Sequence, residues 1–259
     1  MINFFGNKSE PERNNYEKAA EWIAGSSDVV AFTGAGISVE SGIPPFRGPD
    51  GLWSKYDPSV LELSSFYNKP QKTWKILKEI FYEHFETVEP NRAHEVIGKL
   101  EQEGYIRSVV TQNIDNLHQE GGSQNVWEFH GTYRRFECQS CDKTFPFEEV
   151  NIEVAVPECT ECGGLLKPDI IFFGEGIPEP AGSKSFEEAE SCEIMLIVGT
   201  TGEVMPASMI PNRAKEAGAR IIEVNKKTSA YTNTVTDIYL EGKATEVMER
   251  LYGQLPIYD

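Results

Sequence analysis

Four of the five cysteines stand in two CxxC pairs, which is the strongest chemical signal in the sequence. Cys138 and Cys141 form the first pair and Cys159 and Cys162 the second, with 17 residues between the pairs. This spacing is typical of a zinc ribbon, in which four thiolates surround one tetrahedral ion. A redox dithiol, the alternative, would need only one pair. We expect one structural zinc ion with no ligand position left for water, and we expect Cys192 to be a buried apolar side chain.

A group of polar side chains follows the apolar run at residues 106–111, which has the composition of a buried strand. Gln112, Asn113 and Asp115 come directly after it, at the strand end where parallel sheets collect their ligands. An Asn or Asp at such a place can also cap a helix, and one residue could do both. These side chains are therefore candidates for a ligand site.

His130 is the histidine whose surroundings favour chemistry. It follows Trp127-Glu128-Phe129 and precedes Gly131, at a predicted strand end. An imidazole with a pKa of about 6.5 suits acid–base catalysis at neutral pH. A structural histidine is the alternative, and it is the interpretation that we give to His84 and His94.

A glycine loop follows the run DVVAFT at residues 28–33. Gly34, Ala35 and Gly36 could let a phosphate approach backbone N–H groups at a helix N-terminus, or could form a tight turn without a ligand. The loop departs from GxGxxG, and no acidic strand end follows about 20 residues later, as a dehydrogenase would require. This argues against hydride transfer and leaves a dinucleotide site open.

Short apolar runs alternate with helical patterns along most of the chain, which predicts a parallel, doubly wound sheet. The strands are expected at residues 28–33, 106–111, 169–173, 194–199 and 220–224, and the helices at 15–25, 91–104 and 207–217. Two segments interrupt the alternation: a Pro/Gly/Arg loop with an aromatic-rich helical stretch at 44–85, and the cysteine-bearing segment 135–167. We expect one domain over residues 1–259, in which 15–43, 86–134 and 168–259 form the Rossmann-like part around a helical insert and a zinc-binding insert.

The composition is that of a globular enzyme, with 39% apolar and 25% charged residues. The net charge of −17 repels nucleic acid and anionic membranes, so we expect no membrane contact and no direct nucleic-acid binding. It favours basic partners, or simply gives a well-solvated surface. The first 15 residues turn polar too early for a signal peptide, and we expect a cytoplasmic protein.

Several motifs, in this order, resemble those of the sirtuins, NAD-dependent protein lysine deacylases. They are GAGISVESGIPPFRG at 34–48, TQNIDNLH at 111–118, FHGTYRRFEC at 129–138, the two CxxC pairs, FFGE at 172–175, GTT at 199–201 and EVN at 223–225. Two positions depart from the family pattern. Pro45 replaces a usual Thr or Asp, and GTTGEVMPA at 199–207 replaces a loop similar to GSSLVVYPA. Neither change removes a titratable catalytic group.

The resemblance implies NAD as cofactor, acetyl-lysine proteins or peptides as partners, and His130 as the general base, assisted by Asn113. The products are nicotinamide, free lysine and 2′-O-acetyl-ADP-ribose. His118 would support the pocket by packing and hydrogen bonding. By the same resemblance, the residues that contact NAD are Gly34, Ala35, Gly36, Ser38, Val39, Phe46, Arg47, Gln112, Asn113, Ile114, Asp115, Gly199, Thr200, Thr201, Asn225, Lys226 and Ala244. Those that contact the substrate are Ile114, Ile171, Phe173, Gly174, Glu175, Val204 and Met205.

The resemblance also bears on acyl specificity. Family members that prefer succinyl or malonyl groups carry a Tyr-x-x-Arg pair in the helical insert, where this chain has Leu77 and Ile80. We therefore expect an apolar pocket base, unless Lys75 or Lys78 turns inward. Two other functions remain open: a protein mono-ADP-ribosyltransferase with the same NAD pocket, and a non-catalytic NAD-sensing module.

Overall fold

The computed structural model describes residues 14–48, 51–83 and 87–256. The N-terminal residues behind the cytoplasmic prediction lie mostly outside this part of the chain, and so does His84. In the described ranges, no helix is long and apolar enough to cross a membrane.

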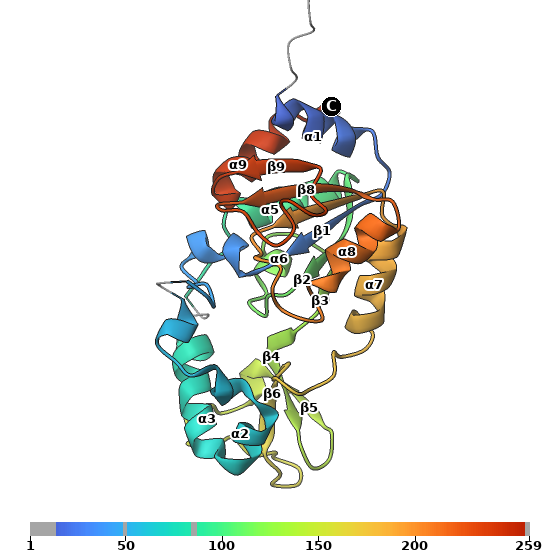
Figure 1. Cartoon of the computed structure of the whole chain (residues 1–259). Helices are drawn as coiled ribbons and strands as arrows, with labels where there is room; N and C mark the ends of the chain where they lie inside the picture. Colours follow the sequence, from blue (N-terminus) through green and yellow to red (C-terminus); the bar gives the residue numbers. More distant parts are fainter. Residues whose placement is uncertain (1–13, 49–50, 84–86, 257–259) are drawn as a thin grey trace, which may run out of the picture.

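Six strands form one parallel sheet in the order β3-β2-β1-β7-β8-β9 (Figure 1). The strands are β1 (Val29–Thr33), β2 (Ile106–Thr111), β3 (Val126–Glu128), β7 (Ile194–Val198), β8 (Arg220–Asn225) and β9 (Ile238–Glu241). This is the doubly wound order, in which successive strands are added outward on one side of β1 and then, from β7 on, on the other side. The predicted fold class is confirmed.

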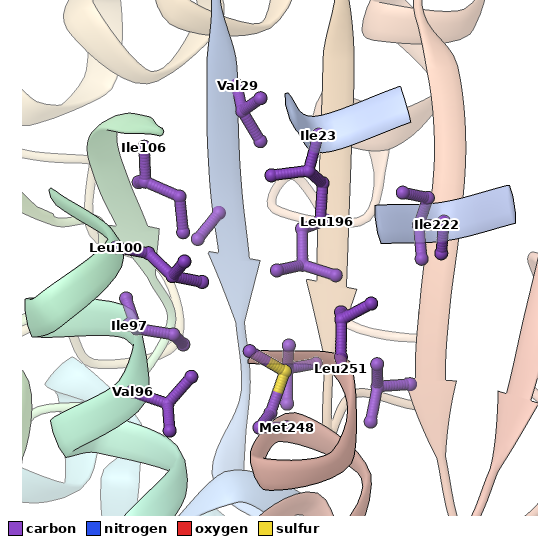
Figure 2. Packing of buried hydrophobic residues seen from close by; sticks show 14 of the residues in the cluster. Ile23, Val29, Val96, Ile97, Leu100, Ile106, Leu196, Ile222, Met248 and Leu251 are labelled. Carbon is purple, nitrogen blue, oxygen red and sulfur yellow. The ribbon is translucent and has the colours of Figure 1, made fainter. Parts of the chain in front are cut away.

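Helices cover both faces of this sheet, which is why its central strands are apolar throughout. Every residue of β1 and β7 is buried, as is typical of parallel strands between two helical layers. The helices are α1 (Asn15–Ala24), α5 (Arg92–Gln102), α6 (Leu117–Glu120), α7 (Ala181–Ser191), α8 (Met209–Glu216) and α9 (Ala244–Tyr252). Each face of the sheet has its own hydrophobic core. Figure 2 shows one of them, in which Ile23 of α1, Leu100 of α5 and Met248 of α9 pack against Val29 and Leu196 of the sheet.

A smaller lobe lies beside the carboxyl edge of the sheet (Figure 1). It contains an antiparallel sheet in the order β5-β4-β6 and the helices of the helical insert, around a separate aromatic-rich core. Its elements are α2 (Leu63–Asn68), α3 (Pro70–Leu77), a π-helical turn (Lys78–Tyr82), β4 (Gly131–Cys138), β5 (Thr144–Pro146) and β6 (Leu166–Ile170). Trp74 illustrates the packing, because it is fully buried and donates its indole N–H to the Leu166 carbonyl.

One predicted strand was wrong in place and in partner. Residues 169–173 were expected in the main sheet, but the strand ends at Ile170 and pairs antiparallel with β4. The apolar run is buried there by the small lobe's core, and periodicity alone does not say which sheet a buried run joins. The small sheet also extends beyond the predicted insert 135–167, since Gly131 pairs with Ile170. The division of the chain into parts otherwise stays a prediction.

Candidate active site

A cavity of about 320 Å³ lies where the carboxyl ends of β1 and β7 meet the small lobe. This is the point at which the strand order reverses, where doubly wound sheets bind their ligands. The residues around it come from the main sheet, the 44–85 segment and the loop after β6. They are Gly34, Ala35, Gly36, Pro45, Phe46, Arg47, Trp53, Leu61, Phe81, Gln112, Asn113, Ile114, His130, Ile170, Ile171, Phe172, Phe173, Gly174, Glu175, Ile177, Gly199, Thr200, Thr201, Val204, Met205, Pro206 and Asn225.

The glycine loop after β1 packs directly on the loop after β7. Gly34 donates its N–H to the Val198 carbonyl at 3.1 Å, and Gly36 donates to the Gly199 carbonyl at 2.7 Å. A Cβ at Gly36 would lie 2.6 Å from that same oxygen, so only glycine fits. Of the two alternatives left open for this loop, a helix N-terminus or a tight turn, the structure has a tight turn, the three-residue 3₁₀ turn Ala35–Ile37. The Ala35 N–H is the loop amide that faces no acceptor within the described ranges.

Behind the cavity wall, a buried hydrogen-bond network holds the QNID segment. Ser38 donates its hydroxyl hydrogen to Asp115 at 2.6 Å and accepts from the Asn113 amide at 3.0 Å. Asp115 also accepts the N–H of Leu117, the first residue of α6, although the N-cap position of that helix is Asn116. Burial raises the pKa of Asp115, and the Ser38 hydrogen bond opposes that shift. Asn113 is thereby fixed in one orientation at the cavity.

His94 and His118 lie deep behind this network, and burial lowers the pKa of each. His94 accepts the Asn91 N–H at the start of α5, and its other ring nitrogen lies 3.3 Å from Ser38 Oγ. His118 Nε2 lies 2.8 Å from Thr33 Oγ1. Neither imidazole lines the cavity, in agreement with the structural role expected for both.

His130 lies between β3 and β4, and its ring lines the cavity. Its Nδ1 is 2.9 Å from the carbonyl oxygen of Gln112. A carbonyl oxygen only accepts, so Nδ1 carries the hydrogen and Nε2 keeps its lone pair. Burial lowers the pKa of His130, and the hydrogen bond to Gln112 partly offsets the shift. The imidazole is therefore neutral at pH 7, with Nε2 able to accept a proton.

Two exposed loops that line the cavity have backbone N–H groups without an acceptor in the described part of the chain. Phe173 and Met205 are 51% and 65% exposed, although both are large and apolar. Within the described part of the chain, the N–H groups of Gly174, Val204 and Met205 have no hydrogen-bond acceptor. An extended peptide placed between the loops could pair with both, as in strand addition.

The charge of the cavity differs from that of the whole chain. Of the described residues that line it, Glu175 alone carries a carboxylate, and that carboxylate pairs with Lys167 at 3.0 Å. Arg47 supplies a cation at the rim, where Glu203 lies 3.6 Å from its guanidinium. Amides and hydroxyls make up most of the remaining polar groups. In a protein of net charge −17, such a cavity suits an anionic ligand.

The structure brings most of the predicted site residues to this cavity but not all of them. All seven predicted substrate residues line it, as do twelve of the predicted NAD residues and His130. Five predicted NAD residues do not line it. Ser38 and Asp115 lie behind Asn113, Ala244 is buried at the start of α9, and Val39 and Lys226 point to solvent. Their roles stay predictions.

Several residues that line the cavity were not predicted as site residues from the sequence. Leu61 and Phe81 come from the helical insert, and Ile170 and Phe172 flank residues that were predicted. Phe81, in the π-helical turn, lines the cavity, whereas Leu77 and Ile80, the residues expected at the pocket base, do not line it. A π turn shifts the helix face, so α-helical spacing points to the wrong residue.

The four paired cysteines come together at one end of the small lobe. Their Sγ atoms lie within 4.8 Å of one another, and the Cys138–Cys162 and Cys141–Cys159 pairs are 3.5 and 3.8 Å apart. A tetrahedron with bonds of about 2.3 Å has edges of about 3.8 Å, so the cluster fits zinc. Cys192 lies apart, and burial raises the pKa of its thiol to about 12, as expected of an inert side chain.

Comparison with known proteins agrees with this architecture. The Sir2 family model matches residues 34–206. The chain is 43% identical over 240 residues to "NAD-dependent protein deacylase 2" of Pyrobaculum aerophilum, covering 91% of this chain and 94% of that protein. The chain belongs to the Sir2 family.

Solved structures show the same fold. A mutant Sir2 homologue in complex with ADP-ribose superposes with a TM-score of 0.87 at 38% identity, covering 92% of this chain and 95% of the other. A Sir2 mutant with a deacetylated p53 peptide and 3′-O-acetyl-ADP-ribose also gives 0.87, at 32% identity and with coverage of 93% and 99%.

Proposed function

We propose that the protein is an NAD-dependent protein lysine deacetylase that transfers the acetyl group of acetyl-lysine to ADP-ribose. The family membership supports this, as do the deacylase name of its relative and the complex of a similar protein with peptide and acetylated ADP-ribose. The observation that carries the proposal is the neutral His130. His130 has a free Nε2, and it lines the same cavity as the two loops whose N–H groups at Gly174, Val204 and Met205 are available to a peptide.

The donor set of the cavity fits NAD. Thr200, Thr201 and Asn225 would hold the adenosine end, beside the loop after β7. The Ala35 N–H and the Arg47 guanidinium are the groups suited to the pyrophosphate. Phe46 and Ile114 offer apolar surface, and Asn113 a fixed amide, for the nicotinamide ribose. When bound, NAD supplies a glycosidic bond whose cleavage releases nicotinamide and makes the ribose carbon an acceptor for the acyl oxygen.

His130 acts as the general base in this reaction. Its Nε2 takes up a proton from the ribose hydroxyls, while the Gln112 carbonyl keeps the ring in the required tautomer. The imidazolium that forms can still donate from Nδ1 to the same carbonyl, so the ring need not turn. Because burial keeps the pKa of His130 low, the base is ready at neutral pH.

The apolar walls hold the acyl-lysine and exclude water. Leu61, Phe81, Ile114 and Phe172 would surround the lysine stem and the acyl group. Because apolar side chains exclude water from the site, the reacting ribose is protected from hydrolysis. The peptide backbone would pair with Gly174 on one side and with Val204 and Met205 on the other.

The remaining assignments concern the surroundings. We place the protein in the cytoplasm, a reducing compartment in which four thiolates remain available for zinc. Direct nucleic-acid binding is disfavoured by the net charge of −17. Basic segments around the acetyl-lysine would be attracted by the same field.

Incubation of an acetyl-lysine peptide with the protein, with and without NAD, tests the proposal. We expect free lysine peptide, nicotinamide and O-acetyl-ADP-ribose in equal amounts, and none of them without NAD. Nicotinamide release with ADP-ribose attached to protein, but without free lysine peptide or O-acetyl-ADP-ribose, would identify a transferase. NAD binding without turnover would identify a sensing module.

A further inference from the structure

Lys167 is a buried lysine at the edge of the active site that does not itself line the cavity. Its side chain is only 6% exposed. Lysine side chains are rarely buried to this degree unless the ammonium group is paired. The ammonium group lies 3.0 Å from Glu175 Oε2, and it donates to the carbonyls of Ile170 at 2.8 Å and Pro168 at 3.2 Å. It also lies 4.6 Å from the centre of the Phe172 ring. One cation thus joins several points of the segment 168–175.

The hydrogen bond from Lys167 to the Ile170 carbonyl fixes the peptide group between Ile170 and Ile171. Its carbonyl accepts from Lys167, and its N–H donates to the His130 carbonyl at 3.0 Å. The end of β6 is therefore held between the ammonium group and the backbone of the predicted base. The side chains of Ile170 and Ile171 line the cavity on either side of this group.

The ion pair between Lys167 and Glu175 fixes the turn at residues 172–175. Glu175 accepts the Phe172 N–H at 2.6 Å with the same carboxylate oxygen that faces Lys167. In return, the Glu175 N–H donates to the Phe172 carbonyl at 3.0 Å. Gly174 has a φ of +97°, as the third residue of such a turn requires. The Lys167–Glu175 pair thus closes the turn that carries the free Gly174 N–H.

The Phe173 backbone is held from another side. Its N–H donates to the Leu61 carbonyl at 2.7 Å, and its carbonyl accepts from Leu63 at 3.2 Å. Since these bonds use both polar groups of Phe173, the orientation of the Gly174 N–H depends on the turn that follows. The carboxylate of Glu175 and its cation set that turn.

We propose that Lys167 is a positioning residue for the acyl-lysine peptide, acting through Glu175 to hold the turn at residues 172–175 in its peptide-binding form. The inference rests on the proposed function, because it assigns this turn to the peptide. Without the ammonium group, the Glu175 carboxylate would stand in a mostly buried position without a cation. It would turn to water and release the Phe172 N–H.

The experiment measures binding without turnover. Dissociation constants of a fluorescein-labelled acetyl-lysine peptide, without NAD, are compared for the wild type, Lys167→Met, Lys167→Arg, Glu175→Gln and the double variant Lys167→Met/Glu175→Gln. ADP-ribose binding is the control in every variant, since the proposed adenosine site lies on the loop after β7. Peptide KM and kcat are then measured with NAD.

We expect Lys167→Met to weaken peptide binding about tenfold, within the range of coupled polar groups, with ADP-ribose binding changed by less than about twofold. Lys167→Arg should restore most of the peptide affinity. The double variant should bind peptide better than Lys167→Met alone, because a neutral amide oxygen can keep the Phe172 N–H without a cation. With NAD, peptide KM should rise more than kcat falls.

Unchanged peptide affinity in Lys167→Met would overturn the inference, and so would equal loss of peptide and ADP-ribose binding. If Lys167→Met does not fold, Glu175→Gln decides, because it keeps the lysine and its carbonyl contacts. We expect a few-fold loss of peptide affinity there, and no loss would contradict the inference. A wild-type protein that binds no acetyl-lysine peptide would refute the proposed function itself, and the inference with it.

Discussion

The chemistry of the site depends on which nitrogen of His130 is free. The Gln112 carbonyl accepts a hydrogen bond from Nδ1–H, so Nε2 is left as the basic atom. Burial lowers the pKa and keeps the ring neutral. Gln112 therefore has a backbone role in addition to its side chain, which reaches Thr200 Oγ1 at 3.0 Å.

Replacing His130 with Ala should lower deacetylation by about 10² to 10⁴, the usual effect of losing a general base. Exchange of labelled nicotinamide into NAD should survive better, because nicotinamide leaves before the base is needed. Steady-state rates and the exchange assay on the same preparation check this, with ADP-ribose binding as the control for folding. Deacetylation by His130→Ala at the wild-type rate would remove the assignment.

Buried His118 makes stability depend on pH. Burial lowers its pKa to about 3, and its Nδ1 has no hydrogen-bond partner in the described structure. The unfolded chain, with a histidine pKa of about 6.5, binds the proton more readily. Stability from this group is thus complete above about pH 6.5 and falls as the pH drops below it.

Between pH 7.5 and 5.5 this single group should cost about 1.4 kcal/mol of the free energy of unfolding. Denaturant unfolding of the wild type and His118→Gln at both pH values measures it. The wild type should lose about 1.4 kcal/mol more than the variant. Burial raises the pKa of Glu128 to about 7, so this group increases the free energy of unfolding as the pH falls, and it does so equally in both proteins. Identical pH dependence in the two proteins would show that burial does not lower the pKa of His118.

At the scale of elements, the sequence predicted what local chemistry determines. The cysteine spacing predicted the metal cluster, and the apolar runs predicted β1, β2, β7 and β8 to within one residue at either end. The short strand β9, of four residues, was not predicted because it offers too few positions for a pattern. The three-residue strand β3 was anticipated only as the strand end before His130. The partner of β6 depends on tertiary packing. The place of Phe81 at the cavity depends on a π turn that residue spacing does not reveal.

The four-cysteine cluster should hold one zinc ion per chain. Metal analysis of the purified protein should find about one equivalent, and Cys159→Ala should lose both the zinc and thermal stability, because the surrounding turns have little core of their own. Cys192→Ala is the matched control and should keep the metal. Unchanged stability in Cys159→Ala, or protein without bound zinc, would contradict the prediction.

The helical insert should select acyl groups without charge. Leu61, Phe81 and Phe172 line the cavity with apolar surface, Lys75 pairs with Glu79 in solvent, and Lys78 donates to the Val154 carbonyl. No cation from α3 or the adjoining π turn therefore faces a buried acyl carboxylate. Succinyl-lysine should react with a kcat/KM lower than acetyl-lysine by roughly 10² to 10³.

Butyryl-lysine on the same peptide is the control, because it has a four-carbon chain like succinyl and lacks the charge. Its kcat/KM for NAD-dependent deacylation should be much higher than that of the succinyl form. Equal kcat/KM for acetyl and succinyl peptides, or a succinyl preference, would show that a cation reaches the pocket.

At the scale of the whole molecule, the fold places an anion-accepting cavity inside an acidic protein. The reversal of strand order between β1 and β7 opens the crevice, and the small lobe covers it with apolar side chains. The crevice would hold NAD, and the space between the two loops would hold the peptide. Both substrates would thus meet at His130, which lies where the main sheet ends and the small sheet begins.

In the proposed reaction the acetyl group moves from lysine to ADP-ribose. A peptide whose acetyl group is labelled with ¹³C tests this directly by mass spectrometry of all products. We predict that the label appears in O-acetyl-ADP-ribose, with one molecule formed for each nicotinamide released. Label found in free acetate from the first turnovers, with NAD left intact, would contradict it.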